Sequence, residues 1–255
     1  MQITLPSEGL DAYKSNSQRA RVATEAWAFA NLYCPNCSSP RLTPAPPNHP
    51  AIDYDCPHCD SFFQLKAQSK KFGTRISDAA YSAMIRAIEE NRTPNLFALH
   101  YDPQEWQVAD LLLIPQFAFP RSAIEKRKPL AATARRAGWV GCNILLGAIP
   151  PDARIPIIRE GKPTPPTEVR REYARLKPLA TLTPKERGWT LDVLNAIRSL
   201  GKQHFNLAEA YTLEDHLSQL HPANRNVRPK IRQQLQILRD KGLLEFLGAG
   251  DYRLT

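Results

Sequence analysis

The sequence of 255 residues lacks any long hydrophobic run. Uninterrupted apolar stretches such as residues 111–114 are only a few residues long, whereas a membrane-spanning helix needs about 18. The first residues also lack the basic start and apolar centre of a secretory signal peptide. We therefore expect a cytoplasmic protein with no membrane partner.

Glycine is also scarce, with 11 residues against 23 prolines, which favours firm turns and interrupted helices. Because 42% of the residues are hydrophobic and 23% are charged, the composition is that of a globular protein and excludes collagen-like or largely disordered chains. Basic residues outnumber acidic residues by 34 to 25, which gives a net charge of +9. A polyanion is therefore the first partner to consider.

Hydrophobic periodicity in the first part of the chain predicts an α/β or α+β domain with a central sheet. Helical spacing is present over residues 11–33 and 77–90, and residues 121–143 form a basic segment that we expect to be a loop. Short strands are predicted over residues 62–66, 96–100, 108–114 and 155–158.

The end of the chain has a different pattern. A proline-rich junction at residues 160–187 precedes three helical stripes and a short hairpin. Three helices followed by a hairpin are the order of a winged helix, a variant of the helix-turn-helix. We therefore predict two domains, residues 1–180 and residues 184–255.

Four of the five cysteines form two Cys-X-X-Cys pairs, a spacing typical of a zinc site. The pairs are Cys34 with Cys37 and Cys56 with Cys59. Because disulfides are rare in the cytoplasm and four thiolates complete a tetrahedral site, we predict a structural Zn²⁺. His58 is then a spacer and Cys142 a free cysteine. The alternative is two chance pairs of buried or redox cysteines.

An acidic residue and a Gln-X-Lys triplet flank the second cysteine pair. Asp53 lies three residues before the pair, and Gln64, Leu65 and Lys66 begin five residues after it. If zinc closes the intervening hairpin, Asp53 comes close to the face of Gln64 and Lys66. This spacing resembles the signature of PD-(D/E)XK nucleases, in which an Asp and an acid-X-Lys hold Mg²⁺ beside the scissile phosphate. A solvated strand face is the alternative.

A closer resemblance extends over the whole chain. The segments that carry it are residues 13–18, 33–37, 53–66, 128–131, 133–139, 141–143, 187–189 and 230–241. Together they resemble the methyladenine-dependent restriction endonucleases of the DpnI type. The resemblance implies a PD-(D/E)XK nuclease core with an inserted four-cysteine zinc knuckle, followed by a C-terminal winged-helix domain. It also implies a type II enzyme that requires Mg²⁺ and cleaves duplex DNA at N6-methyladenine sites, G-m6A-T-C.

Within this resemblance, Asp53, Gln64 and the carbonyl of Leu65 are the expected magnesium ligands, and Lys66 positions the attacking water. The family pattern has Glu where this sequence has Gln64. Gln offers one uncharged amide oxygen, which lowers metal affinity, although Mrr-like nucleases of the superfamily also carry Gln-X-Lys. Two other acids could supply the missing carboxylate, and both could equally be surface charges: Asp55 and Glu25.

We expect DNA contacts in the basic loop and in the last long helix. In the loop we assign Arg135, Arg136 and Trp139, because a tryptophan flanked by glycines can wedge between bases. A core tryptophan beneath a basic surface is the alternative. The apolar methyl group on adenine requires an apolar contact, for which Trp139 and Trp189 are the candidates.

In the helix over residues 225–241 we assign Arg228, Arg232 and Gln233, because recognition helices present their first turns to base edges. Gln can pair with two atoms of adenine. The alternative is a solvated basic face of a winged helix that binds protein.

Two other functions remain open from the sequence. One is a catalytically weak or inactive regulator that binds methylated DNA through a zinc ribbon and a winged helix. The other is a zinc module that binds protein, which explains the positive charge least well. For the nuclease we expect double-stranded DNA methylated on adenine as the partner of a monomer.

Overall fold

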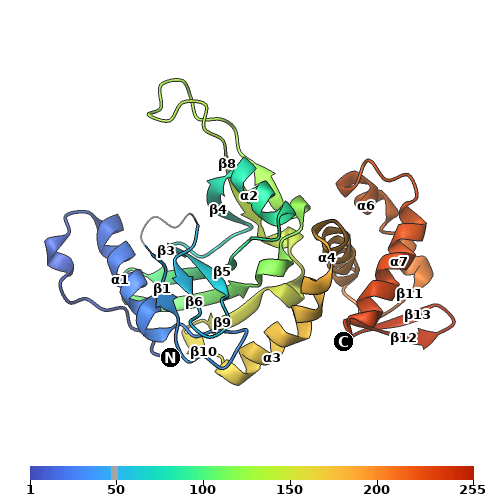
Figure 1. Ribbon diagram of the computed structural model, residues 1–255, viewed down its shortest axis with the longest axis horizontal. Coiled ribbons are helices and arrows are strands. Elements are labelled where there is room, and N and C mark those ends of the chain that lie inside the picture. The colour runs from blue at the N-terminus through green and yellow to red at the C-terminus, as the bar shows by residue number, and fades with distance from the viewer. Residues whose placement is uncertain (47–50) are drawn as a thin grey trace. The chain divides into compact units, whose positions relative to one another are not determined.

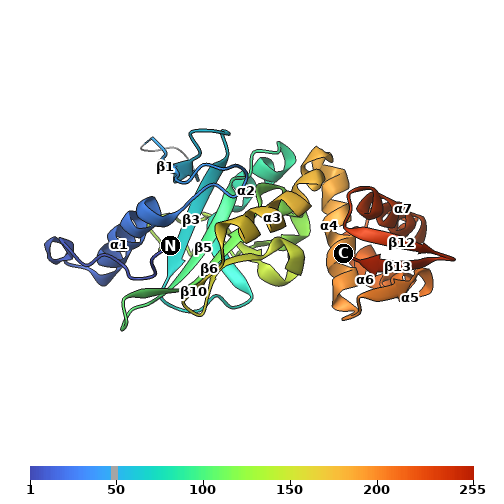
Figure 2. The same ribbon diagram turned by 90° about the horizontal axis from the view of Figure 1, so that it is seen from below.

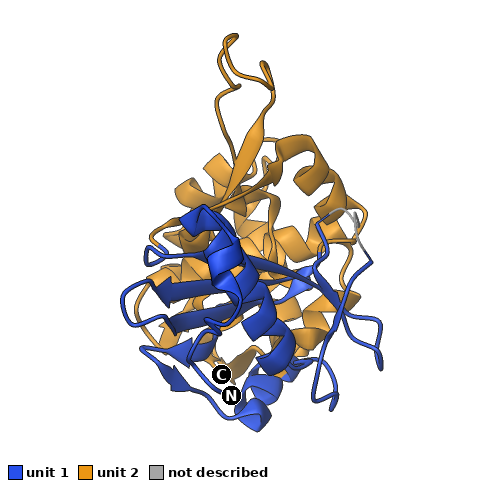
Figure 3. Ribbon diagram, turned by 90° about the vertical axis from the view of Figure 1, so that its left-hand side faces the viewer, with its two compact units in different colours: residues 1–72, 94–116, 154–174 blue, residues 73–93, 117–153, 175–255 orange. Residues whose placement is uncertain are grey.

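The computed structural model describes residues 1–46 and 51–255, and their contacts divide the chain into two compact units (Figure 3). Each unit combines segments that are far apart in the sequence. Unit 1 consists of residues 1–72, 94–116 and 154–174, and unit 2 of residues 73–93, 117–153 and 175–255. The domain boundary near residues 180–184 stays a prediction, and it falls inside the last segment of unit 2.

A mixed sheet forms the centre of unit 1 (Figure 1). Its strands, in spatial order, are β1 (Thr43–Pro44), β2 (Tyr54–Asp55), β3 (Phe62–Gln68), β5 (Asn95–Asp102), β6 (Gln107–Ile114), β9 (Ile155–Arg159) and β10 (Lys162–Pro163). Strands β3 and β5 are parallel, and the other neighbours are antiparallel. All four strands predicted for this part of the chain are confirmed, with somewhat longer bounds.

Helices α1 (Asn16–Asn31) and α3 (Pro166–Leu176) lie on opposite sides of strands β3, β5 and β6 (Figure 2). Helix α1 begins after Ser15, whose hydroxyl accepts a hydrogen bond from the backbone N–H of Gln18 at 3.2 Å. It is shorter than the predicted segment 11–33, since a separate 3-10 turn, η1 (Leu10–Ala12), precedes it. Buried side chains from α1 and the sheet together form the core.

The first part of unit 2 contains an antiparallel sheet in the order β4 (Arg75–Ala80), β8 (Gly141–Leu145) and β7 (Ile124–Lys126). Helix α2 (Tyr81–Glu89) follows β4 directly. The helix predicted over residues 77–90 is therefore wrong in its first turn. Residues 75–80 pair with β8, and this non-local pairing overrides the helical spacing of the apolar residues.

The basic segment over residues 121–143 is only partly a loop. Its two ends form β7 and the start of β8, and residues 127–140 between them extend away from this sheet (Figure 1). The predicted loop is thus confirmed for its central part. The strands at its ends were missed because each contributes only a few residues to the segment.

The last part of unit 2 is the predicted winged helix. Its elements are α4 (Pro184–Ser199), β11 (His204–Asn206), α5 (Leu207–Tyr211), α6 (Glu214–Leu220), α7 (Val227–Asp240), β12 (Leu244–Gly248) and β13 (Asp251–Leu254). The expected hairpin gains a third strand, in the order β11-β13-β12, and the expected second helix is divided into α5 and α6. In the described part of the chain, no helix is long and apolar enough to cross a membrane.

Candidate metal and active sites

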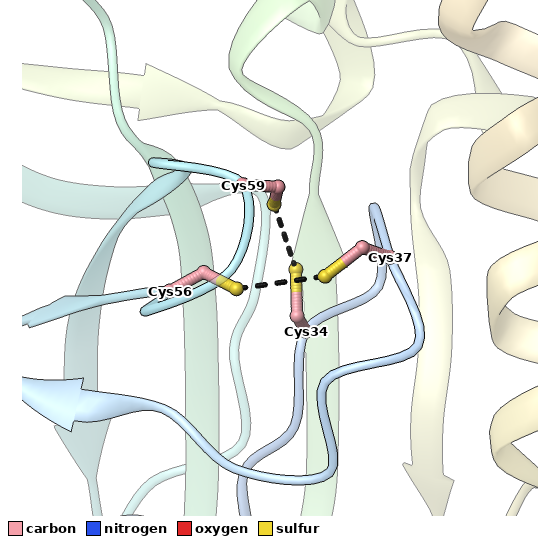
Figure 4. Close-up of side chains that lie close together, drawn as sticks. All are labelled: Cys34, Cys37, Cys56 and Cys59. Atoms are coloured by element: carbon pink, nitrogen blue, oxygen red, sulfur yellow. Dashed lines mark hydrogen bonds between the residues drawn. The ribbon is translucent and has the colours of Figure 1, made fainter.

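The four paired cysteines of unit 1 converge on one point (Figure 4). The sulfur atoms of Cys34 and Cys59 are 3.6 Å apart, those of Cys37 and Cys56 are 3.5 Å apart, and all four lie within 4.8 Å of one another. A tetrahedron with metal–sulfur bonds of about 2.3 Å has sulfur atoms about 3.8 Å apart. The cluster therefore has the donor set and the spacing of a four-cysteine metal site.

Backbone N–H groups support the sulfur atoms, as the turns of metal knuckles require. The N–H groups of Ser39 and His58 donate to the sulfur atoms of Cys37 and Cys56, each at 3.4 Å. The group of four cysteines does not include His58, and its role as a spacer stays a prediction. Cys142 is buried in unit 2, lies outside the cysteine cluster, and its thiol donates a hydrogen bond to the carbonyl of Ala79.

The thiols of this cluster differ in how readily they ionise without a metal. Burial raises the pKa of Cys34 well above its ordinary value. Burial also opposes ionisation of Cys59, but hydrogen bonds with Ser61 outweigh it and lower the pKa of Cys59 to about 7. A bound cation is what would hold all four side chains as thiolates.

Helix α3 holds the first cysteine knuckle through Arg170. Its guanidinium donates to the carbonyl oxygens of Cys34 and Ser39 at 3.1 and 3.0 Å, and it lies over the ring of Tyr33 at 5.1 Å. The next turn of α3 is fixed by Tyr173, whose hydroxyl bonds Asn95 on β5 at 3.0 Å. These contacts join segments more than 70 residues apart, and no local sequence signal predicts them.

A cleft of about 630 Å³ lies on the α1 side of unit 1. The charged side chains that line it are Arg21, Glu25, Asp53 and Lys66. The structure thus brings two of the predicted catalytic residues, Asp53 and Lys66, to one cleft together with Leu65. Gln64 is buried, only 7% exposed, and is not among the described residues that line the cleft.

Asp53 is placed by the antiparallel pairing of β2 with β3. The pairing of Tyr54 with Phe63, continued by one residue, puts Asp53 opposite Gln64. The backbone N–H of Asp53 donates to the carbonyl of Phe63, and the Asp53 Oδ2 atom accepts the N–H of Leu65 at 2.7 Å. Burial raises the pKa of Asp53, although this hydrogen bond and the charge of Lys66 oppose the rise.

The two other acids considered for this site lie in different places. Glu25 lines the cleft, and its backbone carbonyl accepts a hydrogen bond from the hydroxyl of Tyr54 at 3.1 Å. The carboxylate of Asp55 instead accepts the hydroxyl of Thr43 at 2.5 Å, and Asp55 is not among the described residues lining the cleft. The geometry therefore favours Glu25 over Asp55.

The loop of residues 127–140 presents the basic residues assigned to it. Arg135 and Arg136 are exposed, and Trp139 is half-buried. The guanidinium of Arg136 lies over the Trp139 ring at 4.7 Å, and a Cβ atom on Gly141 would lie 2.7 Å from that ring. Trp139 therefore packs closely on the glycine backbone while part of its surface stays accessible.

Helix α7 presents Arg232 and Gln233 as exposed side chains, whereas Arg228 is already engaged. Arg228 donates to the carboxylate of Glu214 on α6 at 2.6 Å. The side-chain oxygen of Gln233 accepts a hydrogen bond from Lys230 at 2.8 Å. Of the three residues assigned to base recognition, Arg228 and Gln233 thus each have a partner within the domain, and Arg232 is exposed.

Trp189 belongs to the core of the winged helix. It is 5% exposed and stacks on His221, with the ring centroids 3.6 Å apart. His221 in turn bonds the carboxylate of Asp192 at 2.8 Å, and Asp192 also accepts the hydroxyl of Ser122. Of the two tryptophans considered for contact with the methyl group, Trp139 is therefore the accessible one.

A winged helix with an exposed basic helix is a DNA-binding module, so the fold defines a DNA-binding protein with an α/β domain. Two family models match the chain. The model of the Dam-replacing family, DpnI, matches residues 1–182, and the model of the Dam-replacing HTH domain matches residues 185–254. The chain belongs to the Dam-replacing family, which confirms the resemblance to the DpnI type and supports a restriction enzyme.

Proposed function

We propose that this protein is a type II restriction endonuclease that cleaves duplex DNA at sites containing N6-methyladenine, with G-m6A-T-C as the expected sequence. The convergence of Asp53 and Lys66 on one cleft, in a chain of the Dam-replacing family, is the observation that carries this proposal. We infer that the protein acts as a monomer.

The residues at the cleft fit a magnesium ion, because Mg²⁺ prefers oxygen ligands. Asp53 is the main ligand and the Leu65 carbonyl at the cleft is the second. The third is the amide oxygen of Gln64, which is buried and lies opposite Asp53 in the strand pairing. Burial raises the pKa of Asp53, but the N–H of Leu65 and the charges of Lys66 and Arg21 favour its ionised form, the form that binds a metal. Bound Mg²⁺ would supply Lewis-acid activation of water and neutralise phosphate charge. Lys66 orients the attacking water and offsets the charge of the phosphate.

The cysteine cluster is proposed to hold a structural Zn²⁺. Its sulfur spacing fits tetrahedral coordination, and four cysteines leave no open position for a substrate. The second knuckle lies between β2 and β3, so a metal bound there would hold together the two strands that position Asp53 and Lys66. Zinc therefore supports the active site without taking part in the reaction.

Both basic regions are proposed to contact DNA. In the loop, Arg135 and Arg136 bind phosphates, and Trp139 makes an apolar contact with the duplex or the methyl group. In α7, Arg228, Arg232 and Gln233 face the DNA, with Arg232 and Gln233 reading base edges. The exposure of these side chains and the match to the HTH model support this arrangement.

A digestion tests the proposal directly. Plasmid DNA prepared with and without adenine methylation is incubated with the protein and Mg²⁺, with EDTA as the control. Cleavage of the methylated plasmid alone, and only with Mg²⁺, is the expected result. Equal cleavage of both plasmids would contradict methylation dependence, and cleavage in EDTA would contradict the role of magnesium.

A second function is favoured by one observation, the uncharged Gln64 in place of Glu. A regulator that binds methylated DNA without cutting it would retain the basic loop and α7 but not need a complete metal site. Binding of methylated duplex with no cleavage at any Mg²⁺ concentration would support this regulator.

A further inference from the structure

The cleft of unit 1 is lined by Glu25, an acidic residue that is not part of the PD-(D/E)XK signature. With Gln64 in place of Glu, the signature itself leaves Asp53 as its only carboxylate. A site with one carboxylate and neutral oxygens binds Mg²⁺ weakly, because charge attracts the cation and displaces its tightly held water. Glu25 lines the same cleft and carries the missing charge.

The backbone of α1 is fixed where it presents Glu25. The hydroxyl of Tyr54, which directly follows Asp53, donates to the Glu25 carbonyl at 3.1 Å. Thr24, beside Glu25, is buried, and its hydroxyl bonds the carbonyl of Ala20 at 2.8 Å. The helix therefore holds Glu25 against the strand of Asp53, while the Glu25 side chain itself is 51% exposed and free to change its rotamer.

In the free protein, the Glu25 carboxylate has a partner that it can give up at little cost. Arg21 lies one turn earlier on α1, and its Nε atom is 2.7 Å from Glu25 Oε1. The Arg21 side chain is 76% exposed, and exposed pairs of this kind contribute little to stability. Arg21 also lies close enough to Asp53 for the two charges to interact, so it balances both carboxylates before a cation enters.

We propose that Glu25 is the second carboxylate ligand of the catalytic metal, taking over the role that Glu has at position 64 in the family. This inference rests on the proposed nuclease function. When the metal binds, the Glu25 carboxylate leaves Arg21 and joins Asp53. Asp55, the other candidate, is held by Thr43 and does not line the cleft.

Metal binding without DNA tests this role independently of cleavage. Mn²⁺, a substitute for Mg²⁺ with oxygen ligands, is titrated into the zinc-loaded full chain, and free Mn²⁺ is measured by electron paramagnetic resonance. We expect Glu25→Gln to weaken Mn²⁺ binding by at least about tenfold, since even the loss of an outer-shell partner commonly costs that much. Asp55→Asn removes the same charge from the adjacent strand and should change the affinity by less than about twofold.

Two further variants separate a ligand from a structural charge. Gln64→Glu restores the family carboxylate, so Glu25→Gln should cost much less in the Gln64→Glu background than in the natural chain. Arg21→Gln removes the partner of Glu25 but keeps its carboxylate, so Mn²⁺ affinity should stay equal or rise. If Arg21→Gln instead weakened binding as much as Glu25→Gln, the helix-surface pair would be the cause and the inference would be overturned.

Asp53→Ala distinguishes this inference from the function on which it rests. Weak Mn²⁺ binding in Asp53→Ala with unchanged binding in Glu25→Gln would overturn the role of Glu25 alone. Unchanged binding in both variants would show that the metal site lies elsewhere, and both proposals would fail. Thermal unfolding of each variant verifies that the chain is folded.

Discussion

At the scale of single residues, the cleft depends most on Asp53, the buried carboxylate opposite the Gln-X-Lys triplet. We predict that Asp53→Ala abolishes cleavage of methylated DNA and leaves DNA binding unchanged or slightly tighter. The metal loses its main ligand, whereas removal of a negative charge near a phosphate does not weaken binding. Single-turnover cleavage and gel shifts measure the two effects, with Asp55→Ala as the control. Unchanged cleavage in Asp53→Ala would place the active site elsewhere.

Base recognition depends on which side chains of α7 are available. We predict that Arg232→Ala weakens binding to the methylated site by about 1–3 kcal/mol and relaxes sequence preference, because Arg232 is exposed on α7 and is proposed to read a base edge. Arg228→Ala should weaken binding to all DNA sequences alike. Because the guanidinium of Arg228 is shared with Glu214, we expect it to contact a phosphate and not a base edge. Titrations of matched and mismatched duplexes at several salt concentrations distinguish base contacts from phosphate contacts. If Arg232→Ala weakened binding to matched and mismatched duplexes equally, Arg232 would contact a phosphate and not a base.

The residues of the candidate site differ in how far the sequence could predict them. Asp53 and Lys66 lie on either side of a cysteine pair, and their spacing resembles the PD-(D/E)XK signature. Both residues belong to one local hairpin, so the sequence could predict that they lie close together. Glu25 and Arg170 reach the site from helices whose positions depend on tertiary packing, and a single sequence contains no local signal for such contacts. Glu25 could be considered only because the signature lacks a carboxylate.

At the scale of elements, prediction succeeded where one strong pattern spans the whole element. Strands β5 and β6 contain the apolar runs 96–99 and 111–114, and α7 has a clear helical stripe that buries Ile231, Leu235 and Leu238. The helical pattern failed at residues 77–80, the start of the predicted helix 77–90, because this backbone pairs with β8 about 65 residues later. Short strands such as β7 and β11 were missed because two or three residues show no periodicity.

If the cysteine cluster holds Zn²⁺ as proposed, the β2–β3 hairpin depends on the metal. We predict that removing Zn²⁺ with a strong chelator speeds amide hydrogen exchange over residues 53–66, because the metal joins the knuckle between these strands to the first knuckle. Cleavage should fall in parallel and return when Zn²⁺ is restored. The winged-helix strands of unit 2 contain none of the four ligands and serve as the internal control. Unchanged exchange over residues 53–66 would contradict the structural role of the metal.

At the scale of the whole molecule, the first helix of the winged helix is part of a larger unit. In unit 2, α4 is tied to segments far earlier in the chain through Asp192 with Ser122, Arg187 with Asn91, and Arg198 with Asp152. From the proline-rich junction at residues 160–187, the sequence predicted that residues 184–255 form a separate domain. These partly buried polar pairs were not predictable, because each partner lies at least 46 residues from the other.

Asp152 binds two guanidinium groups, and this arrangement allows a prediction of stability. Its carboxylate is 3% exposed and bonds both Arg175 and Arg198. We predict that Asp152→Asn lowers the free energy of unfolding of unit 2 by about 3 kcal/mol, since it leaves two partly buried guanidinium groups without their anion. Urea denaturation at pH 7, followed by circular dichroism, measures the loss. Asp251→Asn, on an exposed strand position, is the control.

The dependence on pH gives this prediction a second test. Burial alone would raise the pKa of Asp152, but the charges and hydrogen bonds of Arg198 and Arg175 outweigh it and hold the pKa below its ordinary value. The ion pairs therefore stabilise the fold fully above the pKa of the unfolded chain, and this contribution is lost as the pH falls through the lower pKa of the folded state. The difference in stability between the natural chain and Asp152→Asn should thus shrink in acid. A difference that stays constant from pH 7 to below the pKa of Asp152 would mean that packing, and not charge, makes Asp152 important.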